Sequence, residues 1–234
     1  MLEGPHLLED ALAAGLDLEV VLATEAFLDS ADGRTLEERV GDALVVVEAN
    51  LLADLADADS PRGVLALANP AARDVPVRRP GTYLYVDGLQ DPGNLGALAR
   101  VAEGAGVDGL FLSTGCVASH HPRALRGSAG SLLRLPHRAD ARPDDVQALL
   151  GTEATWLKLA TRGGQDLYTF TDPPSIRVLA VGAEGQGLSP EVEALAGLEL
   201  SIPMGGDVES LNATVSAAVV LFEWRRGARP GGQS

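Results

Sequence analysis

Short apolar runs alternate with helix-forming runs through residues 80–226, and this alternation restricts the possible folds more than any other feature of the chain. The predicted strands, each four or five residues long, lie at 83–86, 109–112, 155–159 and 177–181. The predicted helices lie between and after them, at 95–103, 122–127, 143–150, from 190 onward and at 211–225. Because parallel strands need a crossover connection, usually a helix, the pattern predicts a mostly parallel sheet covered on both faces.

A smaller α/β unit is predicted ahead of this sheet. Its first helix carries apolar residues over 7–12 and ends at Gly15. Asn50 is placed to cap a short helix that ends at Leu55. The predicted strands of the unit lie at 18–22, 43–47 and 63–67.

Residues 69–81 separate the two units. They contain three prolines and no apolar period, so they are predicted to form a linker. We therefore expect two domains, residues 1–72 and residues 80–234.

Composition narrows the class of protein. No apolar run approaches the roughly 18 residues that a membrane-spanning helix needs. The N-terminus has no basic region followed by an apolar core, so no signal peptide is predicted. Cys116 is the single cysteine, which rules out an intrachain disulfide. These features are typical of a cytoplasmic protein.

The charge is unevenly distributed. The net charge is −15, which at first argues against nucleic acid, since phosphate contacts need cations. Residues 1–70 hold 15 acids and three arginines, whereas residues 71–234 have a net charge of only −3. Most arginines of the second segment lie in clusters: Arg73, Arg78 and Arg79; Arg123, Arg126, Arg134 and Arg138; Arg225, Arg226 and Arg229. Each cluster is either an RNA contact or a solvated surface.

Three polar, glycine-rich loops follow predicted strands and precede predicted helices, at 87–94, 182–187 and 202–212. Sites in open α/β sheets lie at the carboxyl ends of the strands, so the loops are expected to share one ligand pocket. Simpler interpretations stay open: Asn94, Ser210 and Asn212 could be helix caps, and residues 182–187 could be a tight turn.

Two other patterns are rejected. Gly104, Gly106 and Gly109 match a dinucleotide-binding pattern, but a helix precedes them and a strand follows, which is the wrong order for that site. Cys116 and the nearby histidines do not have a metal-binding spacing, so no metal is expected.

The three loops, in this order, resemble the three motifs of SpoU/TrmH methyltransferases. The first motif is Asn94-x-Gly96-x-x-x-Arg100, and the second runs from Gly182 to Ser189. The third comprises residues 202–206 together with Ser210-Leu211-Asn212. Residues 121–136 also resemble the family, and residues 3–68 resemble its N-terminal domain more weakly.

The resemblance implies the fold and the reaction. The fold would be a C-terminal trefoil-knotted, parallel-sheet α/β domain with a smaller N-terminal ribosomal-protein-like α/β domain that binds RNA. The protein would be a homodimer that uses S-adenosylmethionine to methylate a ribose 2′-hydroxyl in RNA. Ribosomal RNA is expected rather than transfer RNA, because of the two-domain layout.

The resemblance also implies roles for individual residues. The catalytic group would comprise Asn94, Arg100, Glu184, Ser210 and Asn212. The cofactor would contact Gly182, Ala183, Glu184, Gly185, Gly187, Ile202, Met204, Ser210, Leu211 and Asn212. RNA would contact Arg100, Arg123 and Arg126.

Arg100 is expected to act as a cation that stabilises the developing 2′-alkoxide, because a neutral arginine is costly. The proton acceptor stays open. One alternative is a non-catalytic RNA-binding homologue, and another is a nucleotide-dependent oxidoreductase that binds NAD.

Overall fold

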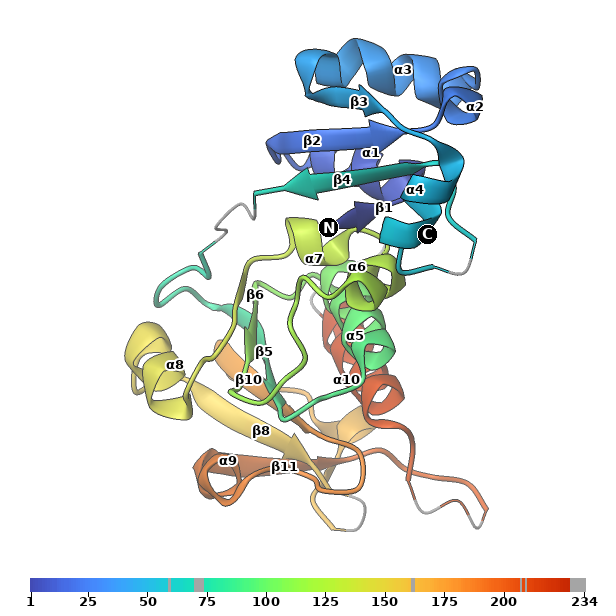
Figure 1. The fold of residues 1–234 in the computed structure, drawn as a ribbon. Coiled ribbons are helices and arrows are strands. Elements are labelled where there is room, and N and C mark those ends of the chain that lie inside the picture. The colour runs from blue at the N-terminus through green and yellow to red at the C-terminus, as the bar shows by residue number, and fades with distance from the viewer. Residues whose placement is uncertain (59, 70–73, 161–162, 207, 209, 228–234) are drawn as a thin grey trace.

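The computed structural model describes residues 1–58, 60–69, 74–160, 163–206, 208 and 210–227. It contains a four-stranded sheet in the first part of the chain and a seven-stranded sheet in the second (Figure 1). Residues 70–73 of the predicted linker lie outside the described residues, as does Arg229 of the third arginine cluster. Among the described residues, no helix has the length and apolar character needed to cross a bilayer.

The N-terminal sheet is mixed, with the strand order β1-β4-β2-β3. β2 runs parallel to β3 and antiparallel to β4, which is antiparallel to β1. Its strands are β1 (Leu2–Glu3), β2 (Leu18–Ala23), β3 (Leu44–Val46) and β4 (Val64–Ala68). Its helices are α1 (Pro5–Ala13), α2 (Glu25–Leu28), α3 (Ala31–Val40) and α4 (Ala49–Leu55), with a 3-10 turn at Gly41–Ala43.

The predicted α1, β2, β3, α4 and β4 are confirmed within a few residues, but β1, α2 and α3 were not predicted. α3 begins at Ser30, whose hydroxyl accepts a hydrogen bond from the Gly33 amide at 3.0 Å. The predicted cap of α4 is wrong. Glu48 occupies the cap position, and the Asn50 side chain accepts from the next amide, that of Leu51, within the first turn.

The C-terminal sheet is parallel throughout, in the order β7-β6-β5-β10-β8-β11-β9. The α/β prediction with a parallel C-terminal sheet is therefore confirmed. Its strands are β5 (Gly81–Asp87), β6 (Gly109–Leu112), β7 (His137–Arg138), β8 (Thr155–Leu159), β9 (Gln165–Asp166), β10 (Ile176–Gly182) and β11 (Ala196–Ser201). Its helices are α5 (Pro92–Ala105), α6 (Pro122–Ser128), α7 (Ser131–Arg134), α8 (Pro143–Leu150), α9 (Pro190–Leu195) and α10 (Ala213–Gly227), with a 3-10 turn at Leu167–Thr169.

Both faces of this sheet are buried. Along β5, Leu84 packs into a core that includes α5 and α10, whereas Tyr83 and Tyr85 pack into a second core with α8 and α9. Figure 1 shows α5 and α10 side by side, away from α8 and α9. The first core continues into the N-terminal domain through residues of α1 and β4, so the two sheets share apolar packing.

The rejected dinucleotide pattern lies where the helix-then-strand interpretation placed it. Gly106 ends α5 in the left-handed region, with φ of 76°, and β6 begins at Gly109. The three glycines therefore form a turn between a helix and a strand.

Candidate active site

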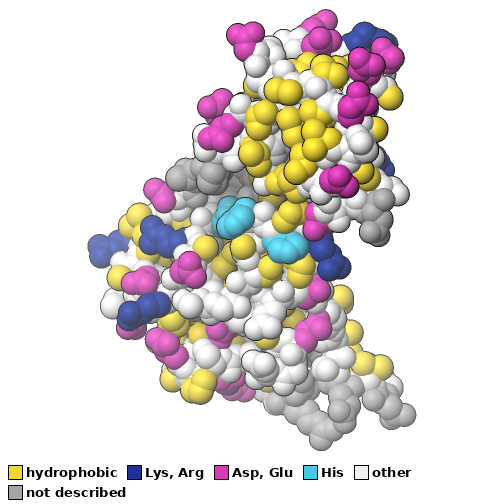
Figure 2. Space-filling model, in the orientation of Figure 1, with side chains coloured by type: hydrophobic (Ala, Val, Ile, Leu, Met, Phe, Trp, Pro, Cys, Tyr) yellow, Lys and Arg dark blue, Asp and Glu magenta, His cyan; other side chains and the backbone are white. Residues whose placement is uncertain are grey.

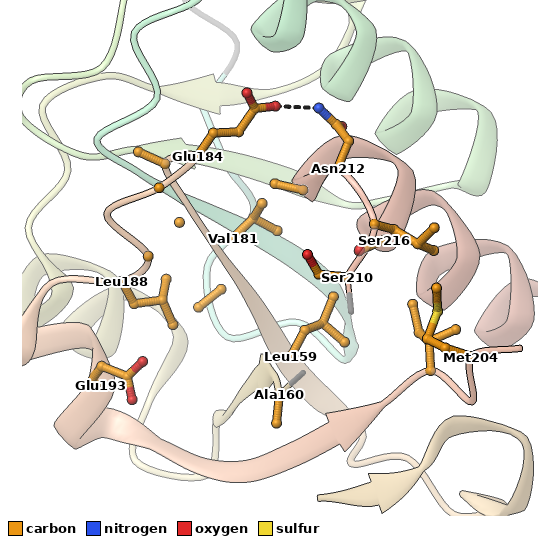
Figure 3. Close-up of a pocket in the computed structure, with 18 residues that line it drawn as sticks. Leu159, Ala160, Val181, Glu184, Leu188, Glu193, Met204, Ser210, Asn212 and Ser216 are labelled. Atoms are coloured by element: carbon orange, nitrogen blue, oxygen red, sulfur yellow. Dashed lines mark hydrogen bonds between the residues drawn. The ribbon is translucent and has the colours of Figure 1, made fainter. Parts of the chain in front are cut away.

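A cavity of about 630 Å³ lies at the carboxyl edge of the parallel sheet, where β8, β10 and β11 end (Figure 3). The strand-end argument predicts that three loops share one pocket, and the structure brings the second and third together there, whereas no residue of the first loop, 87–94, lines the cavity. All ten residues predicted to contact a cofactor line this cavity: Gly182, Ala183, Glu184, Gly185, Gly187, Ile202, Met204, Ser210, Leu211 and Asn212.

The loop after β10 folds back on itself over the cavity. The Gly187 amide donates to the Ala183 carbonyl at 2.9 Å. Gly185 and Gly187 both have positive φ, which side chains other than glycine rarely adopt. A Cβ on Gly182 would lie 2.3 Å from the carbonyl carbon of Gly187. The glycines of this loop are therefore required by its tight backbone.

Glu184 connects all three predicted motifs at the rim of the cavity. Its Oε1 accepts from the Asn94 side-chain amide at 3.1 Å and also from that of Asn212. Figure 3 shows Glu184 and Asn212 pointing toward one another, with Ser210 deeper in the cavity. The carboxylate thus holds the helix entries of α5 and α10 against the loop that follows β10.

The structure decides between the capping and functional interpretations of Asn94 and Asn212. Asp91 caps α5, because its Oδ1 accepts from the Asn94 amide at 2.7 Å. The Asn94 side chain is therefore not a cap. Asn212 does cap α10 through Oδ1, which accepts from the Thr214 amide at 2.9 Å, while its amino group donates to Glu184.

Arg100 lies away from this assembly in its own chain. It is exposed on α5 and is not one of the residues that line the cavity. Within the described part of the chain, its guanidinium makes no hydrogen bond or ion pair. Arg100 is thus an uncompensated cation on the helix that carries Asn94.

Asp87, at the end of β5, contacts the segment that follows the glycine-rich loop. The Asp87 carboxylate accepts from the Ser189 amide at 2.7 Å, which fixes the start of α9. Ser189 occupies the N-cap position of α9, but its side chain makes no capping bond. Burial and then the Asp87 charge raise the pKa of Tyr85, so its phenol stays neutral and donates to the Ala141 carbonyl at 3.0 Å.

Several lining residues were not predicted from the sequence. They are Leu159, Ala160, Ala180, Val181, Leu188, Glu193, Ala213 and Ser216. Leu188 lies within the second predicted motif, and Ala213 and Ser216 follow the third within four residues, so proximity in sequence could have identified them. Leu159 and Ala160 end β8, and nothing in the sequence indicates that β8 pairs with both β10 and β11.

The lining suits an uncharged ring system next to a cation. Among the described residues that form the cavity there is no lysine or arginine, while Glu184 and Glu193 supply carboxylates. Within the described ranges, no group of three or more His, Cys, Asp or Glu residues is arranged to hold a metal.

The arginine cluster around α6 and α7 divides into two sets. Arg123 is exposed and makes no side-chain ion pair within the described ranges. Arg126 contacts Glu3 at 2.8 Å and Asp57 at 2.7 Å, and Arg134 contacts Asp10 and Glu103. The predicted RNA contacts Arg123 and Arg126 are therefore in different electrostatic environments.

Several families of cofactor-binding proteins have a parallel sheet with a glycine-lined cavity at its carboxyl edge. Comparison with known proteins identifies the family here. Residues 81–222 match the model of the SpoU rRNA methylase family, and residues 1–66 match the MRM3-like substrate binding domain. The chain belongs to the SpoU rRNA methylase family.

Individual relatives span almost the whole chain. A Synechocystis protein named as an uncharacterised tRNA/rRNA methyltransferase is 34% identical over 97% of this chain and 83% of its own length. The 23S rRNA (guanosine(2553)-2′-O)-methyltransferase RlmP of Bacillus subtilis is 26% identical over 96% of this chain and 88% of its own. The SpoU methyltransferase AviRb of Streptomyces viridochromogenes, solved with its cofactor AdoMet, superposes with a TM-score of 0.84 at 27% identity, covering 96% of this chain and 88% of its own.

Proposed function

We propose that this protein transfers a methyl group from S-adenosylmethionine to a ribose 2′-hydroxyl of RNA, and that the RNA is ribosomal. The observation that carries the proposal is the cavity itself. All ten predicted cofactor residues line it, and it belongs to a fold that in AviRb was solved with AdoMet. The ribosomal assignment is supported by relatives named as 23S rRNA methyltransferases.

The lining fits this cofactor. Apolar side chains such as Leu159, Leu188 and Met204 offer contacts to an adenine ring and a thioether chain. Glu184 provides negative potential for a ligand that carries a sulfonium and an ammonium group, whereas the Glu193 carboxylate is already paired with Lys158. When bound, the cofactor supplies an electrophilic methyl carbon.

The residues of the chain then have to align the ribose oxygen and handle its proton. Arg100 would hold an RNA phosphate and stabilise negative charge developing on the 2′-oxygen. Asn94, Glu184 and Asn212 form a rigid rim that fixes the helix entries beside the cavity. Ser210 lies within the cavity and would orient the RNA or the cofactor.

We further propose a cytoplasmic homodimer in which Arg100 serves the cavity of the second copy. Arg100 is outside the cavity of its own chain, so one chain alone leaves the predicted catalytic group divided. Val215 and Phe222 of α10 are about half exposed, at 48% and 49%, which leaves apolar surface for a second copy next to α5.

Complementation tests this arrangement. Arg100→Ala and Asn212→Ala are each expected to be inactive as homodimers. If Arg100 acts across the interface, a mixed dimer regains one intact site, because the Asn212→Ala copy supplies Arg100 to the other copy's cavity. If Arg100 acts within its own chain, neither site of the mixed dimer is intact and no activity returns.

Two measurements test the function. Calorimetric titration should show binding of S-adenosylmethionine and none of NAD; NAD binding alone would favour the oxidoreductase. Mapping of 2′-O-methyl positions in cellular RNA, with and without the gene, should show one ribosomal position that depends on the protein. Loss of a transfer-RNA position instead would replace the substrate, and cofactor binding without any lost position would favour a non-catalytic homologue.

A further inference from the structure

Two arginines of the methylase domain are bound by carboxylates of the N-terminal domain. Arg126 on α6 donates from Nη1 to Glu3 at 2.8 Å and from Nη2 to Asp57 at 2.7 Å. Arg134 at the end of α7 donates from Nη1 to Asp10 of α1 at 2.9 Å. Figure 1 shows β1 of the N-terminal domain next to α6 and α7.

Glu3 is the buried part of this junction. Its side chain is only 4% exposed, and it also accepts from the backbone amides of Asp57 and Ala58 at 3.3 and 3.2 Å. A buried carboxylate needs a counter-charge, and Arg126 is the cation that contacts it here. The pairing therefore resists exchange for water more than an exposed ion pair does.

Arg134 extends the junction to the helix that carries Arg100. Its Nε and Nη2 donate to the two carboxylate oxygens of Glu103 at 2.8 and 3.0 Å, a bidentate pair. Glu103 lies three residues after Arg100 on α5, on a neighbouring turn. One guanidinium thus joins α1 of the N-terminal domain, α7 and α5.

The backbone makes room for this contact at Gly130. A Cβ at that position would lie 2.5 Å from the Asp10 carboxylate and 2.5 Å from Nη1 of Arg134. Gly130 also has φ of 78°. The close approach of Asp10 to Arg134 consequently depends on a residue without a side chain.

We infer that Arg126 and Arg134 are positioning residues that lock the N-terminal domain onto α5, α6 and α7. They thereby set where an RNA bound by that domain meets Arg100. The RNA part of this inference rests on the proposed function, whereas the domain lock does not. Arg123, one helical turn from Arg126 and without an ion pair within the described residues, remains available to RNA.

The lock is tested by measuring the distance between the two domains. In a Cys116→Ser background, spin labels at Arg39→Cys of α3 and Asp144→Cys of α8 report on it, since both positions are exposed. The labelled chain is mixed with an excess of unlabelled chain, so that a labelled dimer carries one labelled copy, and the parent should then give one narrow distance distribution. Arg126→Gln combined with Arg134→Gln should broaden it, Arg126→Lys should give an intermediate width, and Arg123→Gln should leave it narrow.

A second variant removes the risk of unfolding. Arg126→Gln leaves Glu3 buried without its cation, whereas Glu3→Gln with Arg126→Gln removes both charges together. That double variant should also broaden the distribution. If the distribution stays narrow in both double variants, the lock does not exist.

Methylation kinetics separate the lock from the proposed function. Loosening the domains should raise KM for RNA about tenfold or more, since hydrogen bonds between charged groups are lost, while the cofactor affinity and the rate at saturating RNA stay near those of the parent. A broadened distribution with an unchanged KM would overturn the claim that the lock sets where the bound RNA meets Arg100. A parent that never methylates RNA would instead refute the proposed function, and the distance measurement would still decide the lock.

Discussion

The two sheets of the molecule bury their faces to different extents. The C-terminal sheet is parallel and covered by helices on both faces, as purely parallel sheets usually are. The N-terminal sheet is mixed, and Val45 and Leu67 on its strands are 45% and 48% exposed. Figure 2 shows a band of hydrophobic side chains over this sheet. The stable frame of the protein is therefore expected to lie in the C-terminal sheet, which also holds the cavity.

Charge separates the two regions in the same way. Residues 1–70 have a net charge of −12, although they match a substrate-binding domain. Three of these acids, Glu3, Asp10 and Asp57, contact arginines of the methylase domain. Part of the negative charge thus serves the junction between the domains, while Arg100 and Arg123, which make no ion pair within the described residues, lie in the C-terminal region.

The largest expected effect contrasts the two sheets directly. Leu84 of β5 is fully buried, so Leu84→Ala should lower the free energy of unfolding by about 2–5 kcal/mol. Leu67→Ala on β4 should cost only about 0.5 kcal/mol, because its side chain is already half exposed. Denaturant unfolding monitored by circular dichroism measures both. Equal losses would show that the face of the N-terminal sheet is covered in solution.

The next largest expected effect is on the rate of methylation, and it follows from replacing Arg100. Arg100→Ala should reduce single-turnover methylation on the order of 10²-fold or more, the usual effect of removing an oxyanion donor. The melting temperature and the cofactor affinity should stay unchanged, since Arg100 is exposed and outside the cavity of its own chain. Arg100→Lys should also be slow, because lysine lacks the planar fork. Near-parent rates for Arg100→Ala would eliminate the proposed role.

Gly96 tests how tightly α5 is held. A Cβ at Gly96 would lie 2.5 Å from the Ala124 carbonyl oxygen and 2.8 Å from the Ser128 amide nitrogen, both on α6. Gly96→Ala should therefore destabilise the protein by about 1–3 kcal/mol through overpacking.

The matched control is Gly104 on the same helix, where the nearest atom to a Cβ would be Phe222 Cζ at 3.6 Å. Gly104→Ala should be neutral or stabilising by up to about 1 kcal/mol, because alanine favours the helix. Thermal unfolding of the two variants decides the comparison. Equal behaviour would mean that α5 and α6 can separate without cost.

The sequence predicts the features of this protein that depend on local patterns, but not those that depend on contacts between distant residues. The alternation of strands and helices predicts a parallel sheet, and the position of the loops after strands predicts one shared cavity, because both follow from local patterns. Strand order is not local, so the contribution of Leu159 and Ala160 was not predicted. The pairing of Arg126 with Glu3 joins residues 123 positions apart, and clustering in sequence grouped Arg126 with Arg123 instead.

The smallest expected effect is a pH dependence at the junction between the two regions. The hydrogen bond from Arg134 holds the pKa of Glu103 below its ordinary value of 4.5. A carboxyl group whose pKa is lowered by folding stabilises the folded state above its unfolded value, and this contribution is lost as the pH falls through the lowered pKa. Glu103 is partly exposed, so the contribution should be about 1 kcal/mol or less.

The difference in melting temperature between the parent and Glu103→Gln should therefore be constant above about pH 5.5 and should shrink as the pH falls below 4.5. Glu37→Gln, on the exposed surface of α3, is the control for a generic loss of charge. A difference for Glu103→Gln that persists unchanged to pH 3 would mean that the side chain contributes through packing and not through its charge.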